Sequence, residues 1–302
     1  MKPFKKLLIL ISTSLLLTGC KFTTQSSDKK ENTSESTSDT GSSGSDSSGG
    51  GQSDTTSSGG GQSTEESSGT TGSSDDTSGG GDVGYYSQCA GLSGNALAEK
   101  LKSFNSAKTP SYDWSRYEAA DEALDDSSSV LCIYTRHNIP KANHCGSYDW
   151  NNWNREHVWT QTAYPKSKTD NHNIFACEGQ INNIRNNFPY AEGGSYVTVH
   201  GHTTECKFTG STFEPCDDAK GEIARSVMYG TVHYSYTMTN IIDSVELCLK
   251  WHLEHPITER DTIRNDVVYG LQGNRNPFVD HPEYACKIWG NTNSKTKQLC
   301  GM

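Results

Sequence analysis

The pattern of apolar and polar positions divides the chain of 302 residues into three parts. Residues 1–20 contain one mainly apolar run, Leu7 to Leu17, interrupted by Ser12-Thr13-Ser14. Residues 21–82 show no apolar periodicity, and their only aromatic side chain is Phe22. In residues 83–302 apolar positions recur at helix and strand spacings, so we expect one folded domain there.

Within residues 83–302 the spacing predicts more helix than strand. Helices are predicted over residues 93–108, 115–125, 217–234, 241–255 and 258–269, and strands over 130–134 and 197–199. Thr258 and Asp261 form an acidic variant of the capping box at the start of the last of these helices. Pro277 and Pro282 predict a C-terminus rich in turns. The expected fold class is α+β, helix-rich with few short strands.

The first twenty residues have the features of a secretory signal. Three lysines precede the apolar run, which is shorter than the about 20 residues that a spanning helix needs. The run ends in Leu-Thr-Gly-Cys, which resembles the bacterial lipobox, and this resemblance implies a lipoprotein acylated at Cys20. We therefore expect export and a lipid anchor on the outer face of the bacterial cell membrane. A secreted protein with an incidental Cys20 is the alternative.

Residues 21–82 are predicted to be a disordered tether. Of these 62 residues, 43 are Ser, Thr or Gly, and such a composition buries too little apolar surface to offset the entropy of folding. A flexible chain of about 60 residues has an end-to-end distance of roughly 40–45 Å. The tether also explains why only 32% of the chain is hydrophobic although the remaining 220 residues suffice for a sizeable core.

The negative charge of the chain lies largely in the tether. The net charge of −10 divides into +3 for residues 1–20, −8 for 21–82 and −5 for 83–302. Residues 136–188 differ from the rest of the domain, with six Lys or Arg against four acids and four histidines besides. A mildly basic, histidine-rich segment is compatible with binding a phosphodiester.

Nine cysteines lie in residues 83–302, and export permits disulfides among them. No C-x2-C pair is present, which argues against a structural zinc site. Because nine is odd, at least one thiol stays free or pairs between chains. We expect bridges between Cys206 and Cys216 and between Cys286 and Cys300. The domain is expected to be a monomer.

Residues 154–189 concentrate groups suited to metal binding and proton transfer. Glu156 and His157 are adjacent, and on an extended segment their side chains point to opposite faces. One can then hold a metal ion while the other acts on a different atom. Asn182 offers a neutral oxygen of the kind that Mg²⁺ or Ca²⁺ binds. Arg185 offers a planar donor for phosphate, or else a salt-bridged side chain.

Several motifs in this stretch resemble the core of the bacterial endonuclease I family, which comprises secreted or periplasmic nucleases of the ββα-metal (His-Me finger) class. The motifs are Arg155-Glu156-His157-Val158, His172-Asn173-Ile174-Phe175, and Gly179-Gln180-Ile181-Asn182 followed by Arg185 and Asn187-Phe188. Residues 221–225 and 272–284 agree. A weaker similarity starts at Tyr85-Tyr86 and residues 94–97, so the resemblance covers about residues 85–290. Ala176 and Trp159 depart from the family pattern. A loop that carries an additional phosphate-binding Arg in some relatives is not recognisable.

The resemblance implies hydrolysis with one metal ion. His157 would be the general base that takes a proton from the attacking water. Glu156 and Asn182 would hold one divalent cation, Mg²⁺ first, with Ca²⁺ or Mn²⁺ as alternatives. Arg185 would contact a phosphate.

Two further asparagines of the motifs are candidate site residues. Asn173 is expected to orient the His157 ring through its second nitrogen, and Asn187 to bind substrate. Residues 272–284 are expected to be structural, because His-Pro and Asn-Pro pairs are typical of turns. His172 is expected to pack and to hydrogen-bond the loop that carries the ligands.

The function implied is that of a tethered, sequence-independent endonuclease cleaving DNA, with RNA left open as a second substrate. A lipoprotein that binds nucleic acid or another polyanion without cleaving it is the alternative from another class. An extracellular phosphodiesterase for small substrates is the third.

Overall fold

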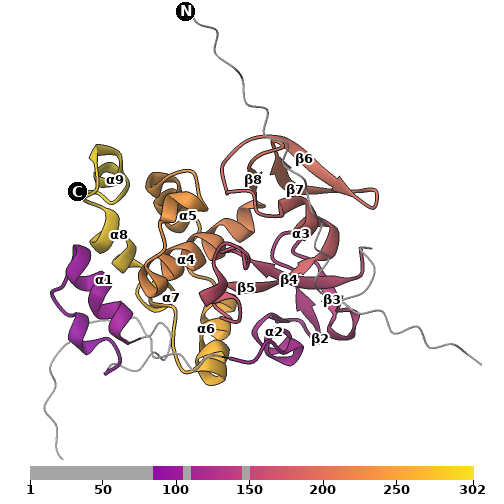
Figure 1. The fold of residues 1–302 in the computed structure, drawn as a ribbon, viewed down its shortest axis with the longest axis horizontal. Helices are drawn as coiled ribbons and strands as arrows, with labels where there is room; N and C mark the ends of the chain where they lie inside the picture. The colour runs from indigo at the N-terminus through magenta and orange to yellow at the C-terminus, as the bar shows by residue number, and fades with distance from the viewer. Residues whose placement is uncertain (1–83, 105–109, 145–149) are drawn as a thin grey trace, which may run out of the picture. The chain divides into compact units, whose positions relative to one another are not determined.

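The computed structural model describes residues 84–104, 110–144 and 150–302, all within one compact unit, Thr77–Met302 (Figure 1). The predicted signal peptide, Cys20 and the predicted tether lie outside the described residues. Among the described helices, none combines the length and the apolarity that crossing a membrane requires.

The described residues form nine α-helices, eight short strands and four 3-10 turns. The helices are α1 (Gly94–Ser103), α2 (Trp114–Ala120), α3 (Gly179–Arg185), α4 (Asp217–Tyr234), α5 (Val245–Glu254), α6 (Glu259–Gln272), α7 (Pro277–Asp280), α8 (Glu283–Trp289) and α9 (Ser294–Leu299). The strands are β1 (Glu122–Ala123), β2 (Asp126–Leu131), β3 (Asn138–Pro140), β4 (Trp153–His157), β5 (Ile174–Glu178), β6 (Ser195–Val199), β7 (His202–Phe208) and β8 (Phe213–Glu214). The 3-10 turns are η1 (Ser87–Cys89), η2 (Lys141–Asn143), η3 (Pro165–Ser167) and η4 (Met238–Asn240).

The strands make three small antiparallel sheets, in the orders β1-β2-β3, β4-β5 and β6-β7-β8. β4 and β5 pair over their whole length, from Trp153 opposite Glu178 to His157 opposite Ile174. Glu178 then caps α3, because its carboxylate accepts from the backbone N–H groups of Gln180 and Ile181. β4, β5 and α3 thus form a continuous strand–strand–helix unit. In Figure 1 the helices α4 to α9 gather on one side of this unit.

The β4–β5 pair separates two apolar clusters. The larger contains Phe175 and Cys177 together with the buried side of α4, and the smaller contains Trp153, Ile174 and Ala176. Because side chains alternate along a strand, β4 has two faces of different composition. We call the face with Asn154 and Glu156 the α3 face. We call the face with Trp153, Arg155 and His157 the Tyr112 face, after an aromatic residue packed against it.

The α+β class is confirmed, and several elements lie where the pattern predicts them. Helices α1, α4, α5 and α6 and strand β6 fall within or close to their predicted ranges, although α1 ends at Ser103 and α5 begins at Val245. The capping box of Thr258 and Asp261 is present at the start of α6. The predicted turn-rich C-terminus is wrong, because α7, α8 and α9 form there.

The predicted helix over residues 115–125 ends early, at Ala120, and the chain turns into β1. The reason is Asp121, which is fully buried. Its carboxylate lies 3.1 Å from Arg260, 2.8 Å from Arg264 and 2.7 Å from the backbone nitrogen of Ala176. These partners come from α6 and β5, so the helix end is set by tertiary contacts. The strand predicted over 130–134 is likewise displaced, to Asp126–Leu131.

One predicted disulfide is present and the other is not. Cys286 in α8 is bonded to Cys300 just beyond α9, which ties the two C-terminal helices together. Cys206 and Cys216 are buried free thiols in hydrogen-bond contact with each other, so the predicted bridge between them is wrong for this structure.

Candidate active site

His157 is the last residue of β4, and only 6% of it is exposed. Its Nε2 lies 3.0 Å from the backbone carbonyl of Lys168. A carbonyl can only accept a hydrogen bond, so this contact favours the tautomer with its proton on Nε2, in which Nδ1 is the basic nitrogen. Burial lowers the pKa of His157 to about 4, which keeps the ring neutral at pH 7. A neutral ring with a fixed tautomer is what a general base requires.

Asn173 does not orient the His157 ring, so that prediction is wrong. Its Oδ1 accepts from the Trp159 backbone nitrogen at 2.7 Å, and its Nδ2 donates to the carbonyls of Trp159 and Ser167 at 3.0 and 3.1 Å. These bonds hold the segment from Trp159 to Ser167, and the next residue is Lys168. Asn173 therefore helps to position the Lys168 carbonyl, which bonds the His157 ring, through the residues that precede Lys168.

Glu156 lies on the α3 face and is 1% exposed. Its Oε1 lies 2.8 Å from the hydroxyl of Tyr134, 3.3 Å from that of Tyr190 and 3.0 Å from Nη1 of Arg185. Burial raises the pKa of the Glu156 carboxyl above its usual value, and the Arg185 charge opposes that shift. These three contacts all fall on Oε1, so they fix the carboxylate while Oε2 takes no part in them.

Arg185 ends α3 and is as buried as Glu156. Its Nη1 donates to the carbonyl of His157 and its Nη2 to that of Val158, both at 2.8 Å. Its guanidinium carbon also lies 4.6 Å from the centre of the Tyr190 ring. The prediction that Arg185 contacts a substrate phosphate is therefore wrong, because its side chain is enclosed and bonded within the protein. Arg185 instead fixes Glu156 and the end of β4.

Asn182 lies one helical turn before Arg185 on α3. Its Nδ2 donates to Oδ1 of Asn154 and to the carbonyl of Arg155, the latter at 3.1 Å. An amide nitrogen has two hydrogens, so both are used and Oδ1 is left as an acceptor. A carboxylate and an amide oxygen are the hard donors that Mg²⁺ or Ca²⁺ prefers. The described residues contain no cluster of three or more His, Cys, Asp or Glu side chains suited to a metal ion.

The structure thus brings four predicted site residues together on β4 and α3: Glu156, His157, Asn182 and Arg185. Asn187 lies two residues beyond α3 and is exposed. Its role in substrate binding stays a prediction.

The family follows from sequence comparison. A model of the endonuclease I family matches residues 93–283, which include all of β4, β5 and α3. The chain belongs to the endonuclease I family. It is therefore a nuclease, an enzyme that hydrolyses phosphodiester bonds.

Curated relatives of this chain agree with the assignment to a nuclease family. An extracellular ribonuclease of Bacillus amyloliquefaciens is 32% identical over 230 residues, covering 68% of this chain and 78% of that protein. An extracellular ribonuclease of Bacillus subtilis is 31% identical over the same shares. An extracellular deoxyribonuclease of Aeromonas hydrophila is 24% identical over 136 residues, covering 43% of this chain and 57% of that protein.

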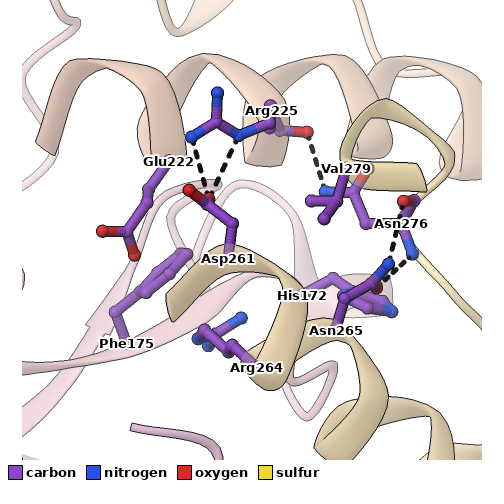
Figure 2. A pocket seen from close by; sticks show the side chains of 9 residues that line it. All are labelled: His172, Phe175, Glu222, Arg225, Asp261, Arg264, Asn265, Asn276 and Val279. Carbon is purple, nitrogen blue, oxygen red and sulfur yellow. Dashed lines mark hydrogen bonds and ion pairs between the residues drawn. The ribbon is translucent and has the colours of Figure 1, made fainter. Parts of the chain in front are cut away.

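Many of the polar residues outside β4 and α3 form a buried framework rather than a second site. A small pocket lies where β5, α4, α6 and α7 meet, and Figure 2 shows the side chains that line it. Its volume of about 20 Å³ leaves room for about one water molecule. It is lined by His172, Phe175, Glu222, Arg225, Asp261, Arg264, Asn265, Asn276 and Val279. Arg225 and Asp261 form an ion pair across it at 2.8 Å. His172 Nε2 lies 3.1 Å from the Asn274 carbonyl, as expected for a structural histidine.

Several residues around the site were not predicted from the sequence. Tyr134 and Tyr190 hold the Glu156 carboxylate, and their only sequence signal is their aromatic character. On the Tyr112 face, the Arg155 guanidinium carbon lies 3.6 Å from the ring centre of Tyr112 and 3.8 Å from that of Trp114. These aromatic residues precede Arg155 by about forty positions, so no local motif announces the contact.

Proposed function

We propose that this protein is an exported, divalent-metal-dependent enzyme that cleaves DNA and RNA without sequence preference. The observation that carries the proposal is His157, a buried neutral histidine whose ring bonds the Lys168 carbonyl and which follows Glu156, with its enclosed carboxylate, on β4. The names of the relatives support both nucleic acids as substrates, because ribonucleases and a deoxyribonuclease are among them.

We further propose that β4, β5 and α3 are the ββα-metal, or His-Me finger, motif of this enzyme. The order strand, strand, helix supports this, with the histidine at the end of the first strand and Asn182 on the helix. The strand pair gives His157 a rigid backbone, and the Arg185 bonds to the carbonyls of His157 and Val158 join the helix to the strand end.

In the proposed reaction Nδ1 of His157 accepts a proton from the water that attacks phosphorus. The Nε2–H stays with the Lys168 carbonyl and stabilises the imidazolium that forms. Contacts to phosphate and sugar carry no sequence information, which agrees with cleavage independent of sequence.

Glu156 and Asn182 would hold the cation, and both residues fit this role. Asn182 presents Oδ1 because its nitrogen is bonded elsewhere, and Glu156 is fixed through Oε1 alone. Mg²⁺ needs few protein ligands, since it keeps several of its waters. When bound, the ion supplies positive charge that stabilises the scissile phosphate and the leaving oxygen. Arg185 favours the ionised form of Glu156 that such binding requires.

The experiment is a gel assay of plasmid DNA and of RNA with the purified protein, with Mg²⁺ and with EDTA. We expect degradation of both substrates with Mg²⁺, none with EDTA, and none with Glu156→Ala. Parallel reactions with Mn²⁺ and Ca²⁺ test the choice of ion. Cleavage that persists in EDTA would contradict metal dependence. Binding of nucleic acid without cleavage would support the polyanion-binding alternative.

We propose that Cys20 anchors the enzyme by its lipid to the outer face of the cell membrane, with the domain facing outside. The support is the sequence Leu-Thr-Gly-Cys at the end of the apolar run. Acyl chains contribute roughly 0.8 kcal/mol per buried methylene, so two or more chains hold a protein stably. In cells that express Cys20→Ser, nuclease activity should move from the cell surface to the medium. Unchanged distribution would contradict the anchor.

A further inference from the structure

Arg155 is the one arginine that forms neither an ion pair nor a hydrogen bond to another side chain among the described residues. Six of the eight arginines form ion pairs: Arg136, Arg185, Arg225, Arg260, Arg264 and Arg275. Arg116 makes two hydrogen bonds to the Asn171 side chain. Arg155 has one long contact, 3.5 Å to the carbonyl of Tyr112. A half-buried charge without a counterion is unfavourable in the free protein and favours an anionic ligand.

Aromatic rings hold the Arg155 guanidinium in a fixed position without neutralising it. The group lies between the rings of Tyr112 and Trp114, at 3.6 and 3.8 Å from their centres. The ring of His144 stacks on Trp114 at 4.5 Å, and Lys168 Nζ lies 5.3 Å from the centre of the Tyr112 ring. The rings cover the faces of the guanidinium, so its N–H edge is the part left to bind a ligand.

The stacked group of Lys168, Tyr112, Arg155, Trp114 and His144 lies beside the proposed general base. Arg155 and His157 are two residues apart on β4 and therefore on the same face. The rings of His157 and Tyr112 are 6.0 Å apart. Lys168 contacts both His157 and the rest of the stacked group. Its backbone carbonyl bonds the His157 ring, and its ammonium group lies over the Tyr112 ring. Lys168 is exposed and forms no ion pair within the described part of the chain.

We propose that Arg155 and Lys168 form a phosphate-binding subsite for the nucleic-acid strand, next to the scissile phosphate. The subsite rests on the proposed nuclease function and adds to it the path of the substrate along the Tyr112 face. Arg155 would bind two phosphate oxygens through its planar edge, and Lys168 would add a point charge. Such contacts serve DNA and RNA alike.

The test is the salt dependence of cleavage of a fluorogenic oligonucleotide at saturating Mg²⁺. In Arg155→Gln we expect KM to rise about 10- to 100-fold, with kcat changed little, because one charge-assisted phosphate contact is lost. The slope of log(kcat/KM) against log[NaCl] should become shallower by about 0.7–0.9, the value of one phosphate contact. Lys168→Gln should reduce the slope similarly, and its backbone carbonyl stays in place. Arg155→Lys should restore the slope.

The matched control is Lys287→Gln, which removes an exposed cation of α8 and should leave KM and the slope as in the wild type. A wild-type slope in Arg155→Gln, even with a lowered melting temperature, would show that Arg155 is structural and overturn the subsite. Wild-type protein that does not cleave would instead overturn the proposed function. The subsite then keeps its own readout, the salt dependence of oligonucleotide binding measured by fluorescence anisotropy in EDTA, and equal slopes for wild type and Arg155→Gln would overturn it.

Discussion

The two faces of β4 place neighbouring residues of one motif in opposite surroundings. On the α3 face, Glu156 is enclosed and its carboxylate binds two tyrosine hydroxyls and Arg185. On the Tyr112 face, Arg155 has rings above and below it and no carboxylate partner within the described residues. The charge of Glu156 is thus neutralised inside the protein, whereas that of Arg155 has no counterion among the described residues. The proposed phosphate contact needs a charge of the second kind.

Two arginines make the contrast sharpest. Arg185 uses its donors on Glu156 and on the carbonyls of His157 and Val158, whereas Arg155 has one long contact to a carbonyl. The chemical group is the same, so its role follows from what surrounds it. Substitution of Arg185 should therefore mainly lower the free energy of unfolding. Substitution of Arg155 should mainly weaken substrate binding.

The largest expected effect is on stability, in Arg185→Met. Removing one partner of a buried ion pair leaves the other charge uncompensated, which lowers the free energy of unfolding by about 3–5 kcal/mol. Urea denaturation measures it. The double variant Glu156→Gln/Arg185→Met should recover part of the loss, because it leaves no buried charge. A loss below about 1 kcal/mol in the single variant would contradict the structural role of Arg185.

Enclosed histidines should make stability depend on pH. Burial lowers the pKa of His172 and of His252 to about 4, against about 6.5 in the unfolded chain. Between these values the unfolded chain binds more protons than the folded one. The free energy of unfolding therefore falls as pH drops from 6.5 towards 4, by up to about 1.4 kcal/mol per pH unit for each histidine.

The variant His252→Gln isolates one of these histidines. Urea titrations at pH 7, 6, 5 and 4.5 give the slope of unfolding free energy against pH. In His252→Gln this slope should be smaller than in the wild type by the contribution of one histidine, up to about 1.4 kcal/mol per pH unit. An identical slope would mean that His252 is not held neutral by burial.

The smallest expected effect on stability is that of Arg155→Gln. It removes ring contacts worth about 0.5–2 kcal/mol, and it also removes a half-buried charge without a counterion, so the two changes partly cancel. We expect the unfolding free energy to change by less than about 1 kcal/mol while the salt slope of cleavage changes. A loss of unfolding free energy as large as that of Arg185→Met would contradict the difference between the two faces of β4.

The parts of the site that depend on local rules could be predicted from the sequence. Glu156 and His157 lie on opposite faces because strand side chains alternate, and Thr258 and Asp261 cap a helix because their spacing permits it. The motifs of residues 154–189 also predict the family, and the family match covers them.

The parts that depend on distant partners could not be predicted. The guanidinium of Arg185 is a group that commonly binds phosphate. The residues that enclose it, such as Tyr190 and Glu156, are brought there by the tertiary fold. The ring of His157 is oriented by a backbone carbonyl, which has no sequence signature, so a side chain, Asn173, was predicted in its place. Asp121 ends α2 early for the same reason, since its partners lie in α6 and β5.

The central claim is that His157 is the general base, and it is tested most directly by the rate of plasmid cleavage in His157→Ala. The account predicts a loss of about 10²–10⁴ in kcat with an unchanged circular dichroism spectrum. The matched control is His252→Ala, another buried histidine that bonds a backbone carbonyl through Nε2, which should lose stability but keep kcat where it is folded. Cleavage by folded His157→Ala at the wild-type rate would contradict the account.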